Sequence, residues 1–183
     1  MTDAVPAALE APLKDFSESD AFLRSAVANH DAERLNRPAP NGGWSVLQCF
    51  AHLASVDHAF ADTVEENLGR LEQGSSNTES IRPSMVWRLF LRVLAPPVRF
   101  RAKAPAPTQP ASVLDPQKVL ADFVGAHDRL RSLAGRCQGL DINRKAFKHP
   151  FIPAKISVGS LYLVAASHDR RHLWQAEQTG HLQ

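Results

Sequence analysis

The strongest constraint on the fold is a helix start in residues 42–50, GGWSVLQCF. The hydroxyl of Ser45 can accept a hydrogen bond from the backbone of Gln48, and the Gln48 side chain can accept one from the backbone of Ser45. This reciprocal pair is a capping box, which fixes the first turn of a helix. Apolar residues then recur at helical spacing as far as about residue 72, ahead of a stop signal at Gly74. The sequence therefore predicts a long helix over 46–72.

Three other long segments carry helix signals of the same kind. Ser17 opens one of them, and Asp115 followed by Pro116 pairs a cap with the residue favoured at the first helical position. We find no convincing alternating strand pattern and no internal repeat in the sequence. Four long helices favour an all-α fold, a four-helix bundle. The expected bounds of the other three helices are 17–35, 116–137 and a last stretch that is capped by Ser157 or Ser160 and ends before Gly180.

The connection between the second and third long helices is elaborated. The stretch SMVWRLFLRVL at 84–94 predicts a short helix, which Pro96 and Pro97 end. An extended, proline-rich crossover follows. The total of 183 residues suits one domain. We expect residues 1–16, rich in alanine and proline, to be frayed, and 17–183 to form a single bundle domain.

Charge and composition exclude several classes of protein. The net charge is only +2, so nothing in the chain as a whole points to nucleic acid as a partner. Two cysteines, Cys49 and Cys137, cannot make a disulfide framework, and the first residues do not resemble a secretory signal. The longest apolar run, LYLVAA at 161–166, is too short to cross a bilayer. We therefore expect a soluble, cytoplasmic protein without a transmembrane segment.

The strongest asymmetry of charge lies in residues 80–114, which hold six basic residues and no acidic one. Three interpretations stay open: a solvated crossover, a surface that docks an anionic membrane or a partner chain, and a nucleic-acid surface. The absence of a recognised nucleic-acid-binding motif disfavours the last. The basic residues are Arg82, Arg88, Arg92, Arg99, Arg101 and Lys103.

Two histidines near the end of the chain indicate a metal site. His168 and His172, in HDRRHLWQ, stand four apart, so a helix places both imidazoles on one face. An open metal site usually takes three protein ligands, and the third must come from another helix of the bundle. His52 is the best candidate, because it lies among apolar residues in CFAHLASV, where an unpartnered ring would be costly. Ala165, small and on the stripe of the pair, leaves room for that ring.

Other polar residues near these histidines have simpler interpretations. Asp57 and His58 are rotated off the ligand face, so we expect surface or partner contacts there. Cys49 is expected to be a buried thiol that fills core space. Asp169, Arg170 and Arg171 are expected on an exposed face with ion pairs, although an arginine at the bundle mouth could bind an anionic substrate. No general base can be named, and the catalytic residues stay unknown.

Together these pieces resemble a known family. The stretch WSVLQCFAHLASVD, followed far downstream by HDRRHLWQ, is similar to the DinB-like (YfiT-like) superfamily of four-helix-bundle metalloproteins. The KHPF at 148–151 and the proline-rich insert also resemble the corresponding features of that superfamily. The resemblance covers the chain from about residue 17. The positions that match are Trp44 and Ser45 at the helix start, His52 as first ligand, His168 and His172 as the pair, and Gln175 as the trailing glutamine.

The resemblance implies a function as well as a fold. Characterised relatives include thiol-dependent transferases and an isomerase, in which a small thiol is believed to bind at the metal. By resemblance we expect a divalent transition metal, zinc or nickel with iron as a further option, held by His52, His168 and His172. The expected partners are a small-molecule electrophile and a low-molecular-weight thiol, with a homodimer as a further expectation. The alternative is a non-catalytic, metal-stabilised helical binding module; a metal-dependent hydrolase is a third option, for which no carboxylate base is evident.

Overall fold

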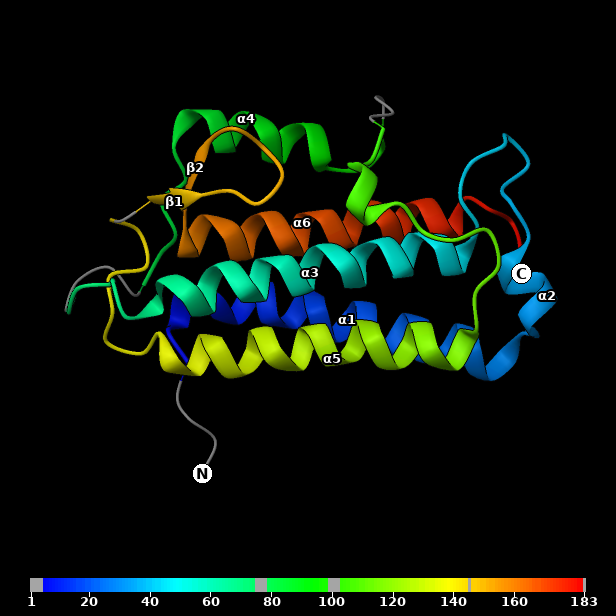
Figure 1. Ribbon diagram of the computed structural model, residues 1–183, viewed down its shortest axis with the longest axis horizontal. Coiled ribbons are helices and arrows are strands. Elements are labelled where there is room, and N and C mark those ends of the chain that lie inside the picture. The colour runs from blue at the N-terminus through cyan, green and yellow to red at the C-terminus, as the bar shows by residue number, and fades with distance from the viewer. Residues whose placement is uncertain (1–4, 75–78, 99–102, 145, 183) are drawn as a thin grey trace.

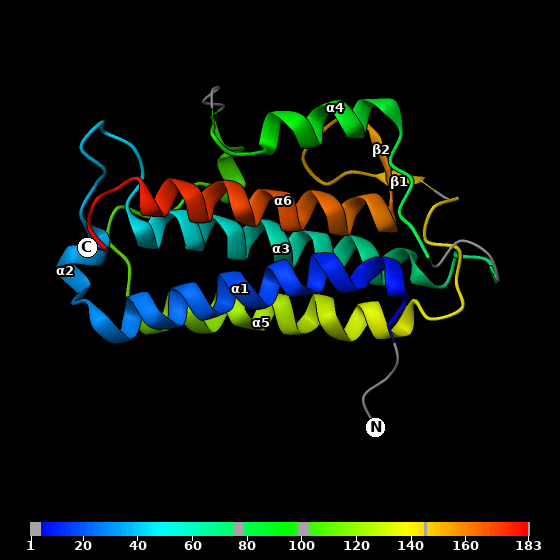
Figure 2. The same ribbon diagram turned by 180° about the vertical axis from the view of Figure 1, so that it is seen from behind.

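The computed structural model describes residues 5–74, 79–98, 103–144 and 146–182. Four long helices lie side by side along the molecule, and α4 lies outside them, over α6 (Figure 1). The view from behind shows the same layers (Figure 2). The prediction of an all-α four-helix bundle is confirmed. The elements are α1 (Ala7–Asn29), α2 (Ala32–Asn36), α3 (Val46–Leu68), α4 (Met85–Leu94), the 3-10 turn η1 (Ala106–Thr108), α5 (Pro116–Arg136), β1 (Ala146–Lys148), β2 (Lys155–Ser157) and α6 (Val158–Glu177).

The helix starts follow the capping signals of the sequence. Ser45 and Gln48 form the full capping box of α3, with both reciprocal hydrogen bonds present. Asp115 caps α5 by accepting from the backbone N–H of Lys118 at 2.7 Å, and Pro116 follows at the first helical position. Of the two serines considered for α6, Ser157 is the cap. Local hydrogen bonding thus fixes where three of the four long helices begin.

The N-terminal prediction is wrong for most of its length. The first helix begins at Ala7 rather than at Ser17, so residues 7–16 are not a frayed segment. Leu9 and Phe16 are fully buried against the other helices, and this burial outweighs the cost of Pro12 inside the helix. Residues 1–4, the rest of the expected frayed segment, lie outside the described residues.

Two other helix ends differ from the prediction. The stretch expected as one helix over 17–35 is broken at His30, which adopts extended backbone, and Asp31 caps the separate helix α2. Helix α3 ends at Leu68, with Gly69 as its cap, rather than near residue 72. Asp31 and Gly69 are both residue types that favour helix ends over interiors, and here they outweigh the continued apolar pattern.

A short hairpin joins α5 to α6 where the sequence indicated only a loop. Strands β1 and β2 pair antiparallel, with Phe147 opposite Ile156. Each strand has three residues, too few for an alternating pattern to be recognised. The hairpin lies under α4 at the start of α6 (Figure 1).

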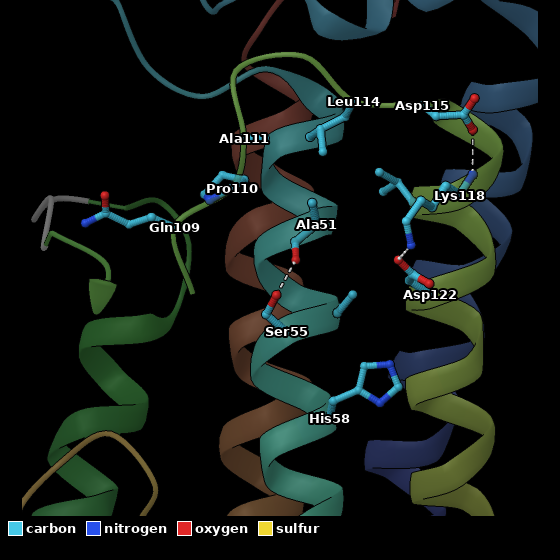
Figure 3. Close-up of a pocket in the computed structure, with 12 residues that line it drawn as sticks. Ala51, Ser55, His58, Gln109, Pro110, Ala111, Leu114, Asp115, Lys118 and Asp122 are labelled. Carbon is cyan, nitrogen blue, oxygen red and sulfur yellow. Dashed lines mark hydrogen bonds and ion pairs between the residues drawn. The ribbon is translucent and has the colours of Figure 1, made fainter. Parts of the chain in front are cut away.

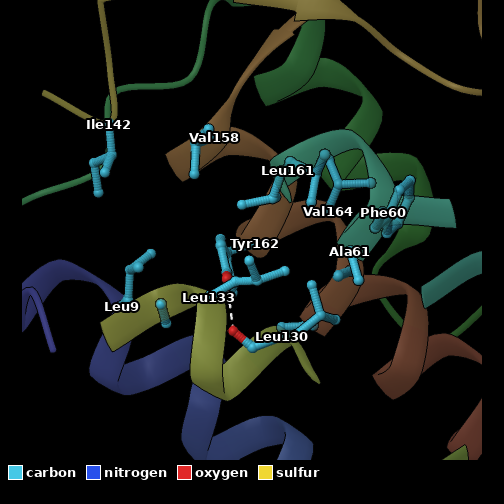
Figure 4. Close-up of a cluster of buried hydrophobic side chains, with 14 of the residues drawn as sticks. Leu9, Phe60, Ala61, Leu130, Leu133, Ile142, Val158, Leu161, Tyr162 and Val164 are labelled. Atoms are coloured by element: carbon cyan, nitrogen blue, oxygen red, sulfur yellow. Dashed lines mark hydrogen bonds between the residues drawn. The ribbon is translucent and has the colours of Figure 1, made fainter. Parts of the chain in front are cut away.

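The long helices enclose a core that runs the length of the bundle. Helix α1 packs on α5 and α6, and α3 packs on the same two from the other side. Tyr162 of α6 is fully buried, and its hydroxyl donates to the carbonyl of Leu130 at 2.7 Å across the core (Figure 4). The larger hydrophobic cluster also takes in α4 through Trp87 and Leu94. A second, smaller hydrophobic cluster, which includes Leu35 of α2 and Phe50 of α3, fills the other part of the bundle.

Several contacts hold the crossover between α3 and α5 against the bundle. The indole N–H of Trp87 donates to the carbonyl of Lys155 at 2.7 Å, which holds α4 on the hairpin. The Gln48 side chain donates to the carbonyl of Ala111. Thr108, in η1, is buried. The outer face of α4 leaves Met85, Val86, Leu89 and Val93 exposed.

The interpretations of the basic segment stay open. Arg99 and Arg101 lie outside the described residues, so the patch cannot be assembled from its members. Among the helices that the structure describes, none has both the length and the apolarity that crossing a membrane requires.

Candidate metal centre

The three histidines singled out by the sequence come together between α3 and α6. One ring nitrogen of each of His52, His168 and His172 lies within 4.8 Å of the corresponding atoms of the other two. The Nε2 atoms of His168 and His172 are 3.1 Å apart. Ligand atoms around one transition-metal ion, each about 2.0–2.2 Å from it, stand roughly this far from one another. The helical spacing of four and the packing of α3 on α6 therefore produce a convergent set of donor atoms.

The crossover fixes the orientation of the His52 ring. Its Nδ1 lies 2.8 Å from the carbonyl oxygen of Thr108, and because a carbonyl can only accept, Nδ1 carries the proton. The Nε2 atom then keeps its lone pair and is free to bind a metal. Metal-binding histidines usually have such a partner on the second nitrogen. Trp44 closes another side, with its ring 4.9 Å from that of His52 and 5.7 Å from that of His172.

The three rings are held neutral. Burial lowers the pKa of His52, in spite of the bond to Thr108. Burial and the neighbouring His52 lower the pKa of His168 to about 3, and burial with the other two rings lowers that of His172 well below its ordinary value. Neutral imidazoles offer lone pairs at neutral pH, which is the state that metal binding requires.

The site is nearly closed. His52 is 3% exposed and His172 is 6% exposed, whereas His168 is partly exposed. The guanidinium of Arg171 lies close enough to lower the pKa of both His168 and His172, and it donates to the carbonyl of Val93 on α4. Arg171 is therefore half-buried at the edge of the site, and the expectation of a fully exposed charged face is wrong for it.

His149, the histidine of the KHPF stretch, lies near enough to His168 to help lower the pKa of that ring. It is buried, and its Nδ1 accepts from the backbone N–H groups of Phe151 and Ile152 at 3.1 Å each. Its Nε2 is buried without a partner, and burial lowers its pKa to about 4. Trp87 stacks on the ring. In the sequence, the KHPF motif marked His149 as part of the family resemblance, but it did not indicate that the ring is buried.

Two acidic residues expected at the surface are in the interior. Asp57 and Asp169 are both 0% exposed and face His127 of α5, which is also fully buried. Helix α3 is enclosed by α5 and α6, so a residue rotated away from the histidine face still points into the protein. Arg170 meets the expectation: it is exposed and pairs with Asp15.

Burial and mutual contact set the pKa values of Asp57, Asp169 and His127. Burial and the nearby Asp169 carboxylate raise the pKa of Asp57 to about 7. Burial also raises the pKa of Asp169. Burial alone would lower the pKa of His127, but Asp169, Asp20 and Asp57 together raise it to about 11. A ring nitrogen thus holds a proton among carboxylates here, in contrast to the neutral rings of the histidine site.

A cavity of about 410 Å³ lies on the outer groove between α3, α5 and the crossover (Figure 3). His58, partly exposed, points toward it, together with Ser55, Lys118 and Asp122. None of the three convergent histidines lines this cavity. Cys49 is fully buried in the smaller hydrophobic cluster, as the sequence predicted.

Comparison with known proteins identifies the family. The sequence model of the DinB superfamily matches residues 15–176. The chain belongs to the DinB superfamily. No curated protein matches this superfamily member significantly.

One solved structure is similar to this DinB superfamily chain: YfiT from Bacillus subtilis, described as a probable metal-dependent hydrolase with an unusual four-helix bundle topology. It is 20% identical, with a TM-score of 0.49, and the match covers 94% of this chain and 85% of YfiT. The likeness is too distant to carry an argument about function.

The residues present fit a divalent metal ion. Three imidazoles converge, and the Nδ1 proton on His52 leaves its Nε2 free. The buried Nδ1 atoms of His168 and His172 have no hydrogen-bond partner. Imidazole nitrogen suits zinc, nickel, iron and copper alike, so the donor set does not choose among them.

Proposed function

We propose that this protein is a metal-dependent enzyme that activates a small thiol for reaction with an electrophilic small molecule. The observation that carries the proposal is the convergence of one nitrogen from each of His52, His168 and His172. Three protein ligands leave a coordination position open, as in catalytic rather than structural sites. The chemistry that an ion supplies in such a site is Lewis acidity, which favours the thiolate form of a bound thiol.

The residues around the histidines have separate tasks in this proposal. His52 is oriented by Thr108, and Trp44 covers the rings and excludes water. The partly exposed side at His168 is where a substrate would enter, and Arg171 lies at its edge to attract an anionic group such as a carboxylate on the substrate. In the overall reaction with an activated aryl halide the thiol sulfur forms a bond to the ring carbon, the carbon–halogen bond breaks with its electron pair leaving on the halide, and the thiol proton goes to solvent.

The alternative is a metal-stabilised binding module. The burial of His52 and His172 favours it, because a nearly closed site resembles a structural one. The metal would then tie α3 to α6. A hydrolase is a weaker third option, since no carboxylate is found among the described contacts of the three rings. A homodimer and a cytoplasmic location stay predictions.

The first experiment is elemental analysis of untagged protein, compared with His52→Ala. We expect about one equivalent of a transition metal that is lost in the variant. His58→Ala is the matched control, because this residue lies on the same helix, is partly exposed and lies outside the histidine set. Full metal occupancy in His52→Ala would overturn the ligand assignment.

A second assay separates the enzyme from the module. Metal-loaded protein is mixed with glutathione or cysteine and an activated aryl halide, and loss of free thiol is followed over time. The enzyme predicts turnover that His168→Ala abolishes. Stoichiometric metal without turnover of any thiol would favour the binding module.

A further inference from the structure

A second group of candidate ligands lies inside the bundle, at the meeting point of α1, α3, α5 and α6. Asp57 of α3, His127 of α5 and Asp169 of α6 each place one ligand atom within 4.8 Å of the other two. Asp20 of α1 and Arg131 of α5 complete the group from the outside. We call these five residues the carboxylate cluster.

The inner face of the carboxylate cluster lacks hydrogen-bond partners. All four carboxylate oxygens of Asp57 and Asp169 are buried without one. The same holds for Nε2 of His127, although it lies 3.0 Å from an oxygen of Asp169 and 3.5 Å from one of Asp57. Neither contact has the direction of a hydrogen bond. Five buried ligand atoms without a hydrogen-bond partner in three adjoining side chains are unusual, because buried polar groups are normally satisfied.

The outer face fixes which nitrogen of His127 is available. Nδ1 lies 2.7 Å from an oxygen of Asp20, and since a carboxylate only accepts, Nδ1 carries the proton. Arg131 holds the other Asp20 oxygen at 2.6 Å. A carboxylate on the far nitrogen is the usual support of a metal-binding histidine. Phe16 and Phe123 pack on the ring and fix its plane.

A divalent cation opposite a neutral His127 would balance the charges of the carboxylate cluster. Asp20, Asp57 and Asp169 contribute three negative charges when ionised, against one on the Arg131 guanidinium. A divalent ion opposite a neutral His127 brings the sum to zero. Without an ion, the same sum takes two further protons, for example one on Nε2 of His127 and one on Asp57 or Asp169, in a place where these three side chains are 0% exposed.

The distances suit a metal as well. The separations of 3.0 and 3.5 Å between Nε2 and the carboxylate oxygens are those expected of neighbouring ligands that each lie about 2.0–2.2 Å from one ion. Four oxygens and one nitrogen are a donor set for a borderline ion such as manganese or zinc, more than for a soft one. With both carboxylates able to bind through two oxygens, no water is needed, so the site would be closed.

We propose that Asp57, His127 and Asp169 form a second, structural site for a divalent cation in the core of the bundle, distinct from the three-histidine site and oriented by Asp20. The ion would enter during folding, because these side chains have no exposed surface. The proposal does not depend on the histidine site or on its proposed function.

The test measures the equivalents of bound metal per chain in full-length protein. The protein is refolded from denaturant with excess manganese or zinc and then separated from unbound ions. Four proteins are compared: the wild type, the double variant His52→Ala/His172→Ala, Asp57→Asn, and Asp62→Asn. Asp62 is the matched control, because it lies on the same helix but is exposed and pairs with Arg129. We expect two equivalents in the wild type and in Asp62→Asn, and one in each of the other two.

The outcomes separate the two sites. One equivalent that survives in the double variant and is lost in Asp57→Asn supports the carboxylate cluster even if the histidine site binds nothing. Wild-type protein whose metal disappears entirely in the double variant overturns the proposal and leaves His127 as a buried imidazolium. Two equivalents in Asp57→Asn overturn it as well.

Asp57→Asn could fail to fold, so a measurement on the wild type is needed beside it. Anomalous diffraction from crystals of manganese-loaded protein gives a peak for each bound ion. A peak between Asp57, His127 and Asp169 supports the proposal. A peak only between the three histidines, or none, overturns it.

Discussion

The histidine site and the carboxylate cluster are built from the same two helices, yet they differ in almost every physical respect. His52 and Asp57 share α3, and His168 and Asp169 are adjacent on α6. The histidine site holds neutral rings and reaches the surface at His168, whereas the inner residues of the cluster, Asp57, His127 and Asp169, have no exposed side-chain surface. The difference teaches that position around the helix, more than position along it, decides which of the two polar groups a residue joins.

The largest expected effect is on the carboxylate cluster. His127→Ala leaves Asp57 and Asp169 facing each other without a positive partner, and breaking a buried ion pair typically costs about 3–5 kcal/mol. We expect a loss of that size in the free energy of unfolding, measured by urea denaturation. His58→Ala is the control and should stay within about 0.5 kcal/mol of the wild type. Equal stability of the two variants would show that Asp57 and Asp169 are not held as carboxylates by a positive charge at His127.

The histidine site should respond in the opposite way. His168→Ala removes a ligand but also a buried ring nitrogen without a partner. We therefore expect loss of stoichiometric metal, while stability in the presence of a chelator changes by less than about 1 kcal/mol. Elemental analysis and urea denaturation together check this. A drop as large as that of His127→Ala would erase the distinction between the two regions.

A smaller effect should distinguish the two ends of α3. Ser45→Ala removes the capping box, for a cost of about 1 kcal/mol. His52 lies two turns from this cap and Asp57 lies further along. Hydrogen exchange should accelerate at backbone amides around His52 more than at those around Asp57. Uniform acceleration along the helix would mean that α3 opens as one unit.

The smallest expected effect is on thiol reactivity. Burial raises the pKa of Cys49 to about 12 and that of Cys137 to about 11. Thiolate forms only as the pH rises toward these values, so neither cysteine should react with iodoacetamide at pH 8 while the protein is folded. Mass spectrometry of the intact chain measures this. Rapid labelling of Cys49 would show that the helix next to His52 opens readily.

The convergence of the three histidines could be predicted from the sequence, whereas the carboxylate cluster could not, and the reasons are physical. A spacing of four on a helix brings His168 and His172 together whatever the rest of the fold does, and the apolar neighbours of His52 indicated that it was buried. The burial of Asp57 and Asp169 depends instead on where α5 places His127. No local pattern around a carboxylate reveals a partner that distant in the chain.

The errors at the N-terminus and in the hairpin have a related cause. Residues 1–16 are rich in alanine and proline, so the apolar positions Leu9 and Phe16 did not stand out as helical. These two residues are helical because they are buried and not because their neighbours favour a helix. The three-residue strands are held by pairing with each other, which cannot be seen in either one alone. The capping residues, by contrast, act within four positions and were predicted correctly.

The hydrogen bond from His52 to Thr108 has a consequence for how this site can change over evolutionary time. The acceptor is a main-chain oxygen, so the side chain at position 108 is not what orients the ring. A substitution at position 108 therefore keeps the acceptor as long as the backbone follows the same path. Insertions or deletions between Pro105 and Gln109 would shift that oxygen and turn the ring. The orientation of His52 is thus inherited through the length of a loop rather than through the identity of any residue in it.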